Sequence, residues 1–237
     1  MDIHKPKSVH NWRELAKEIG IIVIGVLIAL GAEQAVDALH WMNQVDAGNT
    51  ALKAAFVREV KNSALRASEH DCIVQRLAFL SQVVQQASGS GRLPPIAALG
   101  HPPFVPWTIG TWEALVTSGT VSHLPRDAMI RYTTIAQRSA FLSGLSDREE
   151  AQWTVLDTMV GPGRRLSDVE AEQLRITLAE AADSNRFMRT TSGGLRDAVR
   201  ATGLLQPSDF AQADRLAAID RKNAAICHPL ASATAGK

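Results

Sequence analysis

The most constraining feature of the sequence is an uncharged apolar run of 14 residues from Ile19 to Ala32. As an α-helix this run would extend about 21 Å, which is less than the roughly 30 Å of a bilayer's hydrocarbon core. Further apolar residues flank it on both sides, and Lys17 can extend its amine toward the nearer headgroups. We therefore predict a transmembrane helix over residues 19–39.

Two tryptophans bracket this segment. Trp12 precedes the run and Trp41 follows it. On one continuous helix they would be separated by roughly 43 Å, close to the thickness of a bilayer with its headgroup regions. Because tryptophan side chains favour the interface between membrane and water, we expect both residues to act as interfacial anchors.

The charges around the run are asymmetric and predict its orientation. Four basic residues precede the run, and Lys53 is the first lysine or arginine after it. The four are Lys5, Lys7, Arg13 and Lys17. The positive-inside rule then places the N-terminus in the cytoplasm and the rest of the chain across the membrane. A cleaved signal peptide is the alternative, because Ala29-Leu-Gly31 offers small residues of the kind found at cleavage sites. Helix-compatible sequence nevertheless continues past this point to Trp41 without a breaker.

The remainder of the chain has a helical pattern. Aromatic residues make up only 5% of the sequence, and no segment alternates like a strand. Apolar residues recur at spacings of three and four between residues 52 and 84, which predicts one long helix with an apolar face and a possible break at Gly48-Asn49. The residues of this stripe are Leu52, Phe56, Val60, Ala64, Ile73, Leu77, Leu80 and Val84.

Glycine, proline and helix-capping residues divide the C-terminal part of the sequence into helical segments. Gly119 predicts a left-handed cap after a short helix. Ser146 to Glu149 and Ser167 to Glu170 both match the capping box that opens a helix. Ser192-Gly-Gly194 predicts an interruption, and Pro207 predicts the start of the last helix.

These signals predict an all-α chain with a helical-bundle domain. We expect a basic cytoplasmic tail, a transmembrane helix, a stalk helix, an ordered Pro/Gly-rich connector, the helical domain and a disordered tail. Their ranges are 1–18, 19–39, 40–88, 89–110, 111–230 and 231–237.

Some of these residues also carry a resemblance. Glu18-Ile-Gly-Ile-Ile-Val-Ile-Gly-Val-Leu-Ile-Ala-Leu30, followed by Trp41, resembles the start of a group of uncharacterised proteobacterial single-pass inner-membrane proteins. His4-Lys-Pro-Lys7, Asn11-Trp-Arg-Glu14 and Trp112-Glu-Ala-Leu-Val-Thr-Ser-Gly119 are similar to further motifs of that group, so that the likeness covers about a quarter of the chain. The resemblance implies a bacterial inner membrane with the C-terminal domain in the periplasm. It implies no activity.

The chain has two cysteines, Cys72 and Cys227. Both lie after the predicted span, and cysteines in an exported domain often pair because the periplasm is oxidising. A disulfide would link the long helix to the last one, whereas two buried free thiols are the alternative. With His70 and His228 the cysteines could instead form a zinc site, but Cys227 and His228 are adjacent on the chain and their side chains would diverge on a helix.

Two further sets of residues are weaker candidates. The first set could allow close helix packing in the membrane, because its members are small and four residues apart: Gly25 and Ala29, and Gly31 and Ala35. The second set is a polar group beside the Gly119 turn, formed by His123, Arg126 and Asp127. We expect this group to be exposed, and helix capping is its simpler explanation.

The sequence lacks the Gly-rich phosphate loop, the His-Glu-x-x-His motif and the Gly-x-Ser-x-Gly motif. Net charge is +1 without a basic patch beyond the N-terminus, so we expect no nucleic acid partner. We also expect no cofactor and no metal. The leading hypothesis is a non-catalytic scaffold or accessory subunit that contacts the lipid bilayer and a membrane-protein partner or a second copy of itself. The alternative is a periplasmic small-molecule-binding or sensory module, and an enzyme comes third.

Overall fold

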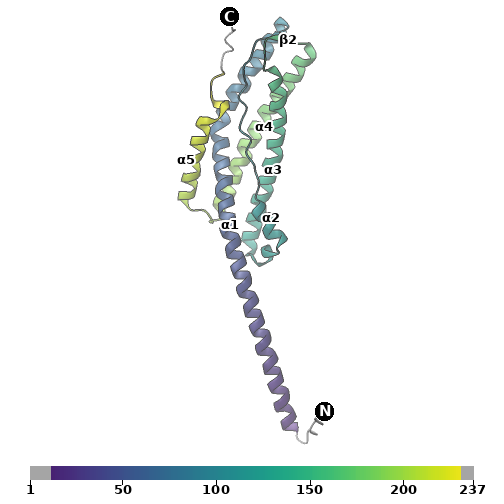
Figure 1. The fold of residues 1–237 in the computed structure, drawn as a ribbon, viewed down its shortest axis with the longest axis vertical. Coiled ribbons are helices and arrows are strands. Elements are labelled where there is room, and N and C mark those ends of the chain that lie inside the picture. Colours follow the sequence, from purple (N-terminus) through teal and green to yellow (C-terminus); the bar gives the residue numbers. More distant parts are fainter. Residues whose placement is uncertain (1–11, 231–237) are drawn as a thin grey trace, which may run out of the picture. The chain divides into compact units, whose positions relative to one another are not determined.

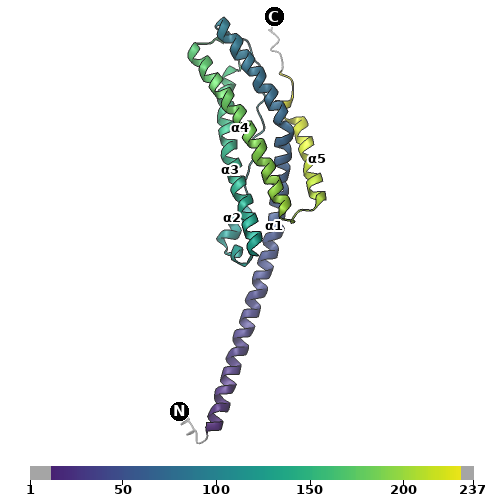
Figure 2. The same cartoon turned by 180° about the vertical axis from the view of Figure 1, so that it is seen from behind.

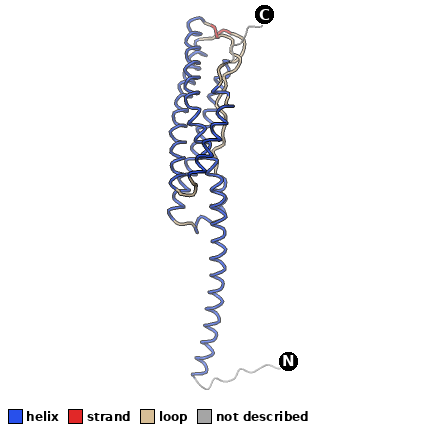
Figure 3. The backbone as a smooth tube through the Cα atoms, turned by 90° about the vertical axis from the view of Figure 1, so that its left-hand side faces the viewer, coloured by secondary structure: helices blue, strands red, loops and turns tan. Residues whose placement is uncertain are grey.

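A computed structural model describes residues 12–230 of the chain. The elements in chain order are α1 (Trp12–Ser90), β1 (Arg92–Leu93), α2 (Gly110–Thr117), η1 (Thr120–His123), α3 (Arg126–Leu156), η2 (Asp157–Met159), β2 (Arg164–Arg165), α4 (Asp168–Ala201), α5 (Pro207–Asn223) and η3 (Ala225–Cys227). The two short strands form one antiparallel ladder, and helices make up most of the rest (Figure 3). The predicted all-α class is confirmed.

The predictions for the chain ends fall partly outside this description. Residues 1–11 of the predicted 1–18 tail, with Lys5 and Lys7, lie outside the described residues, and so does the predicted tail 231–237. The described part of the first tail, from Trp12 onward, is already helical.

The chain divides into two units, Met1–Ala47 and Gly48–Lys237, and helix α1 contributes to both. In the first unit no described residue is buried. Ile21 and Ile28 expose 72% and 67% of their surface. Within the described residues, α1 is the one helix that is long and apolar enough to cross a membrane. A core helix of a soluble protein would bury such a stretch, and this one is exposed.

The second unit is a helical bundle formed by α1 from Gly48 onward, α3, α4 and α5 (Figures 1 and 2). Helices α3 and α4 pack along each other. Polar contacts also join α1 to both of them, since Ser139 of α3 donates to Glu59 and Arg175 of α4 donates to Ser88. The interior contains fully buried apolar side chains from all three helices. Among them are Phe56, Ile73, Leu80, Ile135, Leu142, Leu156, Ala181 and Leu195.

Helix α5 lies beside α1, buries Phe210, Ala213 and Ala217, and is also joined to α1 by charged pairs. The Lys53 amine is 3.5 Å from the Asp209 carboxylate, and the Lys61 amine is 2.6 Å from that of Asp220. Because both pairs advance in the same direction along the two helices, α5 runs parallel to α1. Arg196 of α4 adds a bidentate pair to Asp214, at 2.7 and 2.9 Å.

Several predicted helix ends are confirmed. Ser167 forms the capping box that opens α4, because its hydroxyl accepts the Glu170 N–H and its own N–H donates to the Glu170 carboxylate at 3.0 Å. Gly119, at φ +76°, follows α2 in the left-handed conformation. Pro207 is the first residue of α5.

Two predicted boundaries are wrong. Ser146 to Glu149 does not open a helix, since α3 is continuous through it; Ser146 and Glu149 are buried against the bundle instead. Ser192-Gly-Gly194 does not interrupt α4 either. A Cβ added to Gly194 would lie 2.5 Å from the Arg138 guanidinium, so this glycine leaves room for the end of the Arg138 side chain against α4.

The stretch predicted as a stalk over residues 40–88 also differs from the expectation. Helix α1 has no break at Gly48-Asn49. A Cβ added to Gly48 would lie 2.7 Å from the Leu115 side chain, so the helical domain already closes around α1 at this residue. From Gly48 on, the predicted stalk is a core helix of the domain, because its apolar stripe is covered by α3, α4 and the connector rather than by solvent.

The segment between β1 and α2 runs along the bundle as an irregular chain (Figure 3). Leu99 and Trp107 in it are each 1% exposed. Ile96 forms a pair of backbone hydrogen bonds with Gly161, of 3.0 and 2.8 Å. These contacts fix the connector against the helices.

Candidate functional site

A groove of about 1100 Å³ lies between α1 and α4. On α1 its lining begins at His70. This residue follows Lys53 and Lys61, which pair with carboxylates of α5. Its floor is apolar and mostly small. The floor residues are Val74, Leu77, Ala78, Leu178, Ala179, Ala182, Gly193 and Gly194. Small side chains let another backbone approach closely, so the groove can take an elongated partner.

Three arginines of α4 line this groove: Arg175, Arg186 and Arg189. Arg175 is 2.7 Å from Glu172, and Arg186 is 2.8 Å from Asp183. Both pairs are exposed, and exposed pairs contribute little to stability. The guanidinium groups can therefore exchange these carboxylates for those of a bound partner. Asp197 is the acidic residue in the lining.

Charged residues also lie inside the bundle. Arg66 of α1, 3% exposed, donates to Glu149 of α3 and, at 3.1 Å, to Asn185 of α4. Burial raises the pKa of Glu149, and Arg66 opposes that shift. This cluster joins the three long helices through one guanidinium.

Two further carboxyl groups of α1 belong to the same interior. Burial raises the pKa of Glu59 to about 7, against the lowering effects of Ser139, Arg58 and the Thr108 backbone. Burial likewise raises the pKa of Glu69 to about 7, against the attraction of Arg66. Each has one carboxylate oxygen with no hydrogen-bond partner among the described residues.

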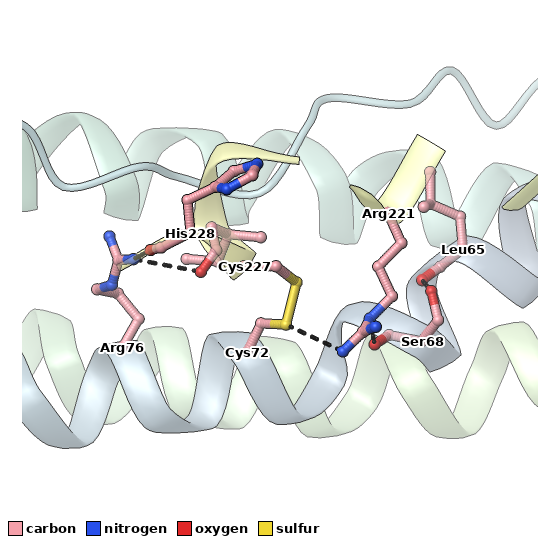
Figure 4. Close-up of a disulfide and its surroundings, with 8 residues drawn as sticks. Leu65, Ser68, Cys72, Arg76, Arg221, Cys227 and His228 are labelled. Atoms are coloured by element: carbon pink, nitrogen blue, oxygen red, sulfur yellow. Dashed lines mark hydrogen bonds between the residues drawn. A yellow bond between two sulfur atoms is a disulfide. The ribbon is translucent and has the colours of Figure 1, made fainter. Parts of the chain in front are cut away.

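The two cysteines meet in a disulfide at one side of the domain (Figure 4). The Cα atoms of Cys72 and Cys227 are 4.9 Å apart, inside the distance of about 7 Å that pairing requires. Arg221 flanks the bridge: its Nε donates to the Ser68 carbonyl at 2.8 Å and an Nη lies 3.8 Å from the Cys72 sulfur. The bond joins η3 to α1.

The disulfide also decides the metal alternative. A zinc site would need both cysteines as thiolates, and these two sulfurs are bonded to each other. In the range that the structure describes, no group of three or more His, Cys, Asp or Glu side chains could hold a metal ion.

The other predicted site residues are placed as follows. Trp12 is 74% exposed and Trp41 is half-buried, with its ring 5.4 Å from that of His40. The small residues Gly25, Ala29, Gly31 and Ala35 are all exposed on the first unit, so their role in membrane packing stays a prediction. His123, Arg126 and Asp127 are exposed as expected, at the end of η1 and in the first turn of α3.

Sequence reasoning missed the buried charged residues of α1. Glu59, Arg66, Glu69 and Arg76 follow one another at spacings of seven, three and seven. These are steps that keep residues on one helical face. The apolar residues Phe56, Ile73 and Leu80 lie at spacings of three or four from members of this series, so the charges continue the apolar stripe. This placement of charged residues on the apolar face of the helix was the signal from which their burial could have been predicted.

Comparisons with known proteins give no match: no family model, no curated protein and no solved structure is similar to this chain. The candidate sites are therefore interpreted from their own chemistry.

Proposed function

We propose that this chain is a membrane-anchored, non-catalytic scaffold or accessory subunit of a bacterial inner-membrane complex, with its helical domain in the periplasm. The observation that carries the proposal is the exposure of the apolar part of α1. Leu27 and Ile28 are more than 60% exposed, and no described residue of the first unit is buried. Such a surface is unfavourable in water by roughly 25 cal/mol per Å², and lipid is the solvent that suits it.

The disulfide supports the proposed side of the membrane. Structural disulfides persist in oxidising compartments and are rare in the cytoplasm. Cys72 and Cys227 both follow the apolar segment, whereas the basic residues Arg13 and Lys17 precede it. Charge and redox chemistry thus favour the same orientation, with a cytoplasmic N-terminus. The resemblance to proteobacterial inner-membrane proteins agrees with this location. We propose the relationship to that group together with the location.

The groove between α1 and α4 supports the scaffold role. Its lining combines small apolar residues with Arg175, Arg186 and Arg189. A helix of a partner could place its apolar face on the floor and acidic residues against the arginines. We therefore propose that the partner contributes an amphipathic, acidic segment.

Site-specific photo-crosslinking in the native membrane tests this role. A photoreactive amino acid at Ala182 or Gly193, both in the groove, should give one discrete adduct of defined mass. The same probe at Val169, which is 82% exposed and outside the groove lining, is the matched control and should give none. Replacing Arg186 and Arg189 by glutamate should abolish the adduct. Folded protein without an adduct at either groove position would contradict the proposal.

The second candidate is a periplasmic small-molecule-binding or sensory module. A specific observation favours it: a pocket of about 540 Å³ lies beside the disulfide. Ligand pockets typically range from about 300 to 1000 Å³. Uptake of a defined small molecule there would give the chain a binding or sensory role, and this role is compatible with a scaffold because the α1/α4 groove has different lining residues.

A further inference from the structure

Arg76 lies one helical turn after Cys72 and projects toward the C-terminal segment beside the disulfide (Figure 4). Its side chain is 6% exposed. One terminal nitrogen, Nη2, donates to the backbone carbonyls of Ile226 and His228. The other, Nη1, is closed to solvent beside Gly100 of the connector and has no hydrogen-bond partner among the described residues.

The positive charge of Arg76 has no carboxylate partner among residues 12–230. No described residue forms an ion pair with Arg76, in contrast to Arg66, which has Glu149. Burial lowers the pKa of Arg76, and no acidic neighbour raises it again. A guanidinium nevertheless stays protonated in proteins, so the charge persists. Buried charges without a partner are costly, and carbonyl dipoles supply only part of what an anion would.

Arg76 lines the pocket of about 540 Å³ beside the disulfide. Among the described residues, the lining of this pocket contains no acidic side chain. The walls are otherwise largely apolar. They are formed by Phe79, Pro95, Ile96, Ile226, Pro229 and Leu230. A cavity with one buried cation, no acid and apolar walls is suited to an anion with an apolar body.

The walls are also held in place before any ligand arrives. The disulfide fixes Cys227 to α1. On the connector side, Gly100 approaches η3 so closely that an added Cβ would lie 2.6 Å from the Ala225 carbonyl oxygen. A preformed site lowers the entropy cost of binding.

We infer that this pocket binds a small organic carboxylate, whose apolar body contacts Phe79 and Ile96 and whose negative charge is stabilised by Arg76. The volume lies within the range typical of small-molecule sites, about 300 to 1000 Å³. This inference does not depend on the scaffold role, because the α1/α4 groove is a separate surface with different lining residues.

A matched pair of probes tests the charge requirement. The full chain in phosphatidylcholine nanodiscs is dialysed against 2-naphthoate or its neutral analogue 2-naphthamide, with empty nanodiscs as the blank. Because a charge-assisted interaction distinguishes the two ligands, the naphthoate should bind at least about tenfold more tightly. Equal affinity for the acid and the amide, or no saturable binding of the acid, would overturn the inference.

Four variants separate the charge of Arg76 from its structural contacts. Arg76→Met should abolish the preference for the acid, and Arg76→Lys should retain most of it because the charge remains. Phe79→Ala, at a half-exposed wall position, should weaken acid and amide equally. Arg215→Met, at an exposed position outside both linings, is the control and should bind as the wild type does. An undiminished preference in Arg76→Met would refute the assignment. Should that variant not fold, the wild-type comparison and Arg76→Lys still decide, since a loss of preference in a folded Arg76→Lys would contradict a role of charge.

Discussion

At the residue scale, the buried charges of α1 shape the stability of the domain. Glu59 and Glu69 are 0% and 2% exposed, and each carboxyl group has a pKa of about 7. In the unfolded chain the same groups would titrate near 4.5. The folded domain therefore binds their protons more strongly than the unfolded chain does. Their contribution to stability is full below the unfolded pKa and is lost as the pH rises through the folded pKa.

The domain should consequently be more stable at about pH 5 than at about pH 8. For Glu59 alone the shift corresponds to a loss on the order of 3 kcal/mol. Glu59→Gln should flatten this dependence because an amide does not titrate. Urea titrations of the full chain at both pH values measure it, with the exposed Glu180→Gln as the control. A wild-type free energy of unfolding that is equal at both pH values would contradict the account.

The Arg66 cluster makes a second prediction at this scale. Arg66→Met leaves the Glu149 carboxylate buried without its partner, so it should lower the free energy of unfolding by about 3 to 5 kcal/mol. Adding Glu149→Met should cost less than the sum of the two single changes, because the Glu149 carboxylate is then no longer buried without its partner. The exposed Arg186 pairs with Asp183 in the same way, and Arg186→Met should cost less than about 0.5 kcal/mol. Equal losses for the two arginine variants in denaturant titrations would show that burial does not govern these pairs.

At the element scale, local signals predicted helix ends better than helix partners. Ser167 and Glu170 satisfy one another within one turn, so the start of α4 is readable from four residues. Ser146 and Glu149 have the same spacing, yet Glu149 is drawn into the interior by Arg66, which lies 83 residues away. Sequence spacing cannot show such a contact. For the same reason the apolar stripe of α1 predicted a helix but not that α3 and α4 would cover it.

The disulfide was predictable from the number of cysteines and from the expected export of the domain. Its effect on stability belongs to this scale. It links η3 to α1 across a sequence separation of 155 residues. The chain-entropy model assigns a loop of this length on the order of 5 kcal/mol, and measured values are often smaller. Reduction should therefore lower the melting temperature of the domain.

A mutant comparison checks the cause of that loss. Cys72→Ser, Cys227→Ser and the double variant should melt at one common temperature, equal to that of the reduced wild type within a few degrees. None of the three should respond to reductant. Mass spectrometry of non-reduced peptides should recover the Cys72 and Cys227 peptides joined. Two free thiols in protein isolated from cells would contradict the pairing.

At the scale of the whole molecule, the chain contains an exposed apolar helical segment in the first unit and a folded domain in the second. The apolar run from Ile19 to Ala32 is followed by a disulfide-containing bundle that begins at Gly48. Under the proposed anchoring, the domain would stay at the membrane surface, which would raise the local concentration of any membrane partner. Anchoring in the membrane and the orientation of the chain are thus the central claim. They determine the compartment in which the groove and the pocket act.

One measurement tests this claim most directly: the activity of alkaline phosphatase fused after Lys237. Cells that carry the fusion are fractionated, the membranes are washed with high salt, and the activity is assayed in each fraction. The enzyme is active only where its own disulfides form. We predict that the activity sediments with the washed membranes. Activity in the soluble periplasmic fraction would mean that the apolar segment is a cleaved signal peptide, and a fusion inactive in every fraction would place the domain in the cytoplasm.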